Sequence, residues 1–235
     1  MSGGGGKSSS LGRRRGLLLA LVCAAPLLAV ACGGGALKYT VDDSTMDAVP
    51  ANERASVLAA YRDLELANDE RRQADGRLEA LQHDADVANL EKQQARLEIE
   101  KAIAEQEGAK AARDDNQANS AAHNKTVADL GLKVSDAKLD WLDQKKDWFK
   151  QGRNAAEAHI ETARARVELE KAKVARRKGI KAAGDIEISD YENQWKSRSA
   201  DWDAEKKDSA SEENDAKKKE GRWRNLDTQF RKMKG

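Results

Sequence analysis

One cysteine, Cys32, lies in a sequence context that could direct its chemical modification. Cys32 follows the small-x-small triplet Ala29-Val30-Ala31 and precedes three glycines. Signal peptidases cut after small residues that close an apolar segment, so cleavage after Ala31 would make Cys32 the first residue of the mature chain. The other cysteine, Cys23, lies within the apolar segment and would be removed with it, which leaves no partner for an internal disulfide.

The segment before Cys32 has the pattern of an export signal. Residues 1–15 carry four positive charges and no acid, and residues 16–31 carry no charge. A basic start, a short apolar core and small residues at its end are typical of a secretory signal peptide. A membrane-spanning helix needs roughly 20 apolar residues, so a permanent span is the less favoured alternative. Arg14-Arg15 is similar to a twin-arginine signal, which leaves a second export route open.

The residues Leu28-Ala29-Val30-Ala31-Cys32 resemble the lipobox of bacterial lipoproteins. The resemblance implies that the Cys32 thiol carries a diacylglyceryl thioether and that its amino group is acylated, with palmitate as the expected kind of chain. Two or three chains hold a protein stably on a membrane. Gly33 in place of Asp implies, by the sorting rule of enteric members, the outer membrane. The alternative is a soluble periplasmic or secreted protein with a free Cys32.

The tryptophans are the second group that could serve a function. Trp141 and Trp148 lie seven residues apart, as do Trp195 and Trp202, and Trp223 continues the second series. Seven residues are two turns of a helix, so each pair lies on one face. We expect these rings to form part of a bundle core; the alternative is an exposed stripe that binds a protein or a glycan.

The remaining sequence favours no enzyme. His83, His123 and His159 are isolated, and no catalytic, phosphate-binding or metal-binding motif is present. We therefore expect no catalytic residue, no metal and no cofactor. Removal of residues 1–31 leaves 38 basic against 41 acidic residues, a net charge of −3. This balance argues against nucleic acid as a partner.

The composition of the mature region predicts an all-α fold. No proline follows Pro50, and Ala, Glu, Lys, Arg and Leu dominate, as in long helices and coiled coils. From Val57 to Arg113, steps of three and four residues meet an apolar side chain at 13 of 17 positions. This repeat indicates a coiled-coil seam, here rich in alanine. We expect a long antiparallel coiled-coil hairpin or an elongated three-helix bundle.

Breaks in the repeat divide the chain. We expect a signal peptide at 1–31, a lipidated Cys32 with a flexible tether at 32–49, and helices at 50–114, 125–178 and 185–235, the last rich in tryptophan. The second helix carries an extra apolar row, which predicts that it lies in the middle. The charged centre of the third predicts a loosely packed or partly disordered segment. A turn near residue 120 would place Trp141 beside Ile99, and Trp148 beside Lys92 in a cation–π contact.

Two functions are compatible with these patterns. The first is a non-enzymatic lipoprotein of the cell envelope, a periplasmic coiled coil that acts as a structural spacer or scaffold. The second is an adaptor that binds an envelope protein or a cell-wall glycan such as peptidoglycan through its Trp-rich C-terminal half. Association of copies through the coiled-coil seams is a further expectation.

Overall fold

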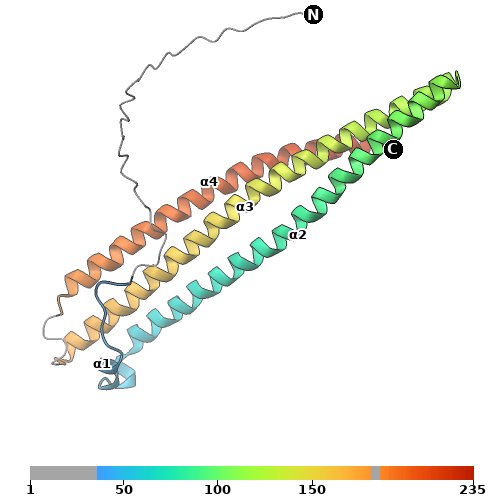
Figure 1. Ribbon diagram of the computed structural model, residues 1–235. Helices are drawn as coiled ribbons and strands as arrows, with labels where there is room; N and C mark the ends of the chain where they lie inside the picture. The colour runs from blue at the N-terminus through green and yellow to red at the C-terminus, as the bar shows by residue number, and fades with distance from the viewer. Residues whose placement is uncertain (1–35, 181–185) are drawn as a thin grey trace, which may run out of the picture. The chain divides into compact units, whose positions relative to one another are not determined.

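A computed structural model describes residues 36–180 and 186–235 of the chain (Figure 1). The described residues form a short helix α1 (Ser44–Asp47), a 3-10 turn η1 (Ala51–Glu53) and three long helices, α2 (Ala55–Ala111), α3 (Asp115–Arg177) and α4 (Ile188–Lys234). These ranges contain no strand, so the all-α prediction is confirmed for the described part of the chain. The helices belong to one unit, residues 34–235.

The turn between α2 and α3 is tighter than the sequence predicted. It comprises residues 112–114 only, whereas we expected a turn near residue 120, between helices at 50–114 and 125–178. Arg113 adopts a left-handed conformation with φ of 56°, and the Asp114 side chain accepts a hydrogen bond from the Gln117 amide at 3.0 Å. An aspartate cap satisfies a free amide at the start of a helix. With this cap, the polar residues that suggested a loop continue α3 instead.

The early turn changes which residues face each other. Lys92 Nζ lies 2.7 Å from a carboxylate oxygen of Asp136, and Lys138 Nζ lies 2.6 Å from Glu91. Lys92 therefore faces a position twelve residues before Trp148, and the predicted Lys92–Trp148 cation–π contact is wrong. The antiparallel arrangement itself is confirmed, because α2 and α3 pack along each other after the turn (Figure 1).

The seam of α2 is built from one heptad position. Every seventh residue from Ala60 to Ala109 is buried, and all but one of them are alanine. Small side chains let two helices approach closely, and a strict seven-residue repeat keeps the seam on the partner. Most of the alternate seam positions are only partly covered, so the core of this hairpin is narrow. The fully buried set is Ala60, Ala67, Ala74, Leu81, Ala88, Ala95, Ala102 and Ala109.

Helix α3 is the middle helix, as its two apolar rows predicted. It packs against both α2 and α4. On the α2 side, Ile160 and Ala163 cluster with Ala67. On the α4 side, Leu169 and Ala172 cluster with Tyr191. This position explains why α3 buries residues on two faces whereas α2 buries one.

Helix α4 runs antiparallel to α3 and is helical throughout, including its charged centre. The phenyl ring of Phe230 lies 3.1 Å from the point where a β-carbon on Gly131 would stand, so glycine permits this close approach. Because α4 ends at Lys234, shortly after this contact, we place the first turns of α3 and the facing end of α2 beyond α4. That end is a two-helix hairpin closed by the 112–114 turn.

Candidate functional site

The segment that precedes α2 is packed rather than free. We predicted a flexible tether at 32–49, but Val41, Met46 and Val49 are buried in a cluster with residues of α3 and α4. The prediction is therefore wrong for this part of the tether. The sequence signal was three apolar side chains, of which only Met46 and Val49 are spaced as on a helix, and it gave no indication of a partner. Cys32 and Ala31 lie outside the described residues.

Backbone groups of this segment are held by side chains of α3 and α4. Gln194 makes a two-point contact with Tyr39: its side-chain oxygen accepts from the Tyr39 amide, and its nitrogen donates to the Tyr39 carbonyl, both at 3.0 Å. The Val41 amide donates to Glu168 at 2.6 Å. Tyr191 donates its hydroxyl to the Thr40 carbonyl at 3.2 Å. We call residues 39–43 and these partners the N-terminal clip.

A buried lysine completes the N-terminal clip. Lys171 is only 4% exposed, and its ammonium lies 2.5 Å from Asp43 and 2.9 Å from Glu168. Burial alone would lower the pKa of Lys171, but the hydrogen bonds to the two carboxylates outweigh it and raise that pKa. The Lys171 hydrogen bond and charge lower the pKa of Asp43 in turn. A buried charge needs such partners, since an unpaired charge in the interior is strongly destabilising.

The five tryptophans lie between core and surface, and each is partly buried. Trp141 of α3 stacks on Trp223 of α4, with ring centroids 4.8 Å apart and planes 4° from parallel. Trp148 contacts its neighbour Phe149, and Trp195 packs against the cluster that holds the N-terminal clip. The stacked rings tie α4 to α3. This arrangement favours the core role that we expected over the exposed stripe.

Trp202 takes part in a layer that joins all three long helices. Its ring stacks on His159 of α3, with centroids 3.9 Å apart. His159 Nδ1 lies 2.7 Å from Glu70 of α2, and the Lys206 ammonium lies 3.9 Å from the Trp202 centroid. Sequence reasoning missed His159, which we interpreted as an isolated solvated residue. Only the register of both helix pairs could have brought these residues together.

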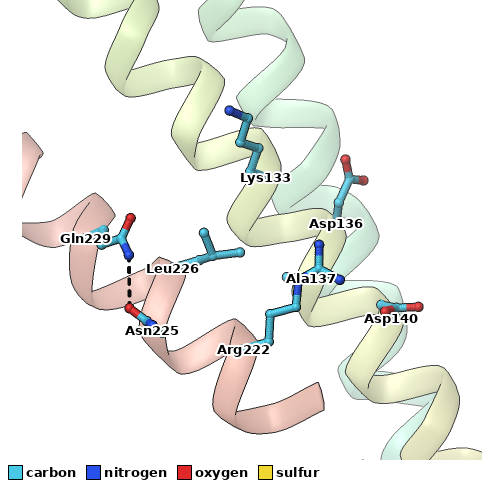
Figure 2. Close-up of a pocket in the computed structure, with 8 residues that line it drawn as sticks. All are labelled: Lys133, Asp136, Ala137, Asp140, Arg222, Asn225, Leu226 and Gln229. Carbon is cyan, nitrogen blue, oxygen red and sulfur yellow. Dashed lines mark hydrogen bonds between the residues drawn. The ribbon is translucent and has the colours of Figure 1, made fainter. Parts of the chain in front are cut away.

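A polar groove of about 580 Å³ lies between α3 and α4 (Figure 2). It is lined mainly by charged and amide side chains, Arg222 among them. Its acids are already paired: Asp136 with Lys92 at 2.7 Å and Asp140 with Lys219 at 3.5 Å. The lining itself holds two acids and two bases, Lys133 and Arg222, and its apolar surface comes from Ala137 and Leu226.

The described residues contain no cluster of three His, Cys, Asp or Glu side chains arranged to hold a metal ion. Across 36–180 and 186–235, no helix combines the length and apolar character needed to cross a membrane. Trp223 Nε1 is buried without a hydrogen-bond partner. Its ring is nevertheless engaged by the stack with Trp141.

Comparison with family models, curated proteins and solved structures returned no match for this chain.

Proposed function

We propose that this protein is a lipid-anchored, non-enzymatic lipoprotein of the bacterial cell envelope, a coiled-coil spacer that holds its hairpin end away from the membrane. Its anchor is a diacylglyceryl group on Cys32, exposed by cleavage after Ala31. Its location is the outer membrane, because Gly33 and not an aspartate follows Cys32. The partner at the far end is an envelope protein or the peptidoglycan.

The N-terminal clip is the observation that supports this proposal most strongly. Tyr39 is fastened to Gln194, at the start of α4. Seven residues separate Cys32 from Tyr39, and seven residues span at most ~25 Å. A lipid on Cys32 would thus keep the membrane within about 25 Å of this end of the helices. A flexible tether of eighteen residues would not fix the distance between the helices and the membrane surface.

The distance to the other end follows from helix length. Helix α2 has 57 residues, which at 1.5 Å per residue gives about 86 Å. Its first residue lies near the clip, and its last residue leads into the 112–114 turn. An anchored chain that stands upright would therefore display this turn roughly 90 Å from its base, which is the property that a spacer requires.

An adaptor that binds through the tryptophans receives less support. The stacked contacts of Trp141 with Trp223 and of Trp202 with His159 occupy ring faces that a ligand would need. A truncation after Gly184 separates the two functions. The spacer function predicts that loss of α4 weakens the packing of α3 and the stability of the whole; the adaptor function predicts a stable α2–α3 hairpin that has lost only its partner.

The intact mass of the N-terminal peptide from a native membrane fraction tests the anchor. The proposal predicts a peptide that begins at Cys32 and carries two or three acyl chains. The matched variant Cys32→Ala should leave the membrane fraction. An unmodified Cys32 in the soluble fraction would remove the anchor and with it the spacer function.

A further inference from the structure

Large apolar side chains remain exposed almost exclusively on α2. Of the eight in the described ranges, seven belong to α2 and one, Met233, lies at the end of α4. Helix α3 contributes none, since it is covered on two sides. Leu90 and Leu97 are each 64% exposed and Val87 is 38% exposed. Scattered exposed apolar residues are ordinary, but a contiguous patch marks an interaction site.

Three of these side chains form a second heptad series that points away from the bundle. Leu90 follows Val87 by three residues and Leu97 follows Leu90 by seven, which is the spacing of the a and d positions of a coiled coil; the a position between the two leucines holds the exposed Gln94. Ala88 and Ala95 occupy the buried seam of the same turns. The stripe Val87–Leu90–Leu97 therefore lies on a face of α2 that neither α3 nor α4 covers.

Acidic residues border this stripe on both sides. With Val87 at a, the g positions hold Glu79, Asp86, Gln93 and Glu100, and the e positions hold Asp84, Glu91 and Glu98, so six of these seven residues are acidic. All six are exposed. Glu91 pairs with Lys138 at 2.6 Å, while Glu79, Asp84 and Glu100 make no ion pair within the described residues. Charges at e and g set which helix a coiled coil accepts.

We infer that this stripe docks an amphipathic helix of another protein, one with apolar a and d positions and Lys or Arg at e and g. Charge complementarity selects this occupant. A second copy of α2 on the same stripe would oppose acid to acid whether the two helices ran parallel or antiparallel. The proposal goes beyond the spacer function and does not depend on lipidation of Cys32.

Binding of two designed peptides to the purified full chain tests the proposal. Both peptides have three heptads with Leu at a and d; one carries Lys at e and g, the other Glu. Fluorescence anisotropy of the labelled Lys peptide should show saturable binding, and the Glu peptide should bind at least tenfold more weakly. The variant L90Q/L97Q should weaken binding of the Lys peptide tenfold or more, since both side chains are exposed and the fold does not rely on them.

The variant L58Q is the matched control, because Leu58 is also on α2 and 50% exposed but lies outside the stripe. It should bind the Lys peptide like the unmodified chain. Equal binding of both peptides, or binding that L90Q/L97Q leaves unchanged, would overturn the proposal. So would self-association of the chain, measured by sedimentation, that L90Q/L97Q abolishes, since the occupant would then be a second copy.

Discussion

The ring of His159 in α3 lies flat against the ring of Trp202 in α4, with centroids 3.9 Å apart and planes within 1° of parallel. The same histidine reaches Glu70 of α2 at 2.7 Å. Since α2 and α4 both pack against α3, this layer is a point where one side chain connects both neighbours of the middle helix. It supplements a seam that buries little apolar area in each turn.

Two replacements of His159 should separate the contribution of its stack on Trp202 to stability from that of its contact with Glu70. An aromatic stack is worth about 0.5–1.5 kcal/mol, and a hydrogen bond such as the one between His159 and Glu70 about 0.5–1.5 kcal/mol. We expect His159→Ala to lower the free energy of unfolding by about 1–3 kcal/mol and His159→Phe, which keeps a ring against Trp202, by less than about 1.5 kcal/mol. Urea unfolding followed by circular dichroism measures both. Equal losses in the two variants would show that the stack contributes nothing.

The alanine seam makes a second prediction. Ala88 is fully buried between α2 and α3, and a larger side chain would force the helices apart. We expect Ala88→Leu to destabilise the fold by about 1–3 kcal/mol, the usual range for overpacking. Thermal unfolding checks this. Ala80→Leu, at an exposed position of the same helix, is the control and should change stability by less than about 0.5 kcal/mol. If both variants melt alike, the seam is not closely packed.

The helices and their buried faces could be predicted because a heptad repeat is recognised from residue types at fixed spacings along one stretch of chain. Ala60 to Ala109 follow it without interruption, and so do most inward residues of α4. The register between α2 and α3 was not predictable, since it depends on a three-residue turn fixed by Arg113 and Asp114. The wrong partner for Lys92 followed from the error in the predicted position of this turn.

The N-terminal clip and the His159 layer were missed for a related reason. Val41 and Met46 lie five residues apart, and only Met46 and Val49 are spaced as on a helix. A single such pair is too short to separate this segment from a tether. His159 lies between Glu157 and Glu161 in the sequence, but its partners Glu70 and Trp202 lie on two other helices. Contacts between distant segments need the register of the whole bundle.

Acid should loosen the N-terminal clip. Lys171 holds the pKa of Asp43 below its ordinary value of 3.8. A carboxyl whose folded pKa is depressed stabilises the fold above its unfolded pKa, and that contribution is lost as pH falls through the folded pKa. We therefore expect the Tyr39 and Val41 amide signals in NMR spectra to move toward unfolded positions as pH is lowered below 3.8. Asp43→Asn should show this loosening already at neutral pH.

A second aspartate provides the control for this pH effect. The pKa of Asp203 is also lowered, by the hydrogen bond and charge of Lys206, but the pair lies on the surface of α4, nine residues beyond Gln194 and outside the clip. Asp203→Asn should leave the Tyr39 and Val41 signals and their pH dependence unchanged. An identical acid response in Asp43→Asn and the unmodified chain would show that Asp43 does not hold the clip.

The most direct test of the spacer is the thickness of the protein layer on vesicles that carry the lipidated chain, measured by cryo-electron microscopy. We expect roughly 90 Å, from the length of α2 at about 1.5 Å per residue. Deletion of residues 102–108 and 118–124 removes one heptad from each arm of the hairpin beyond α4 and keeps the seam in register. This variant should thin the layer by about 10 Å. A layer of only about 10–20 Å, the width of one or two helices, that the deletion leaves unchanged would mean that the coil lies along the membrane, and would contradict the account.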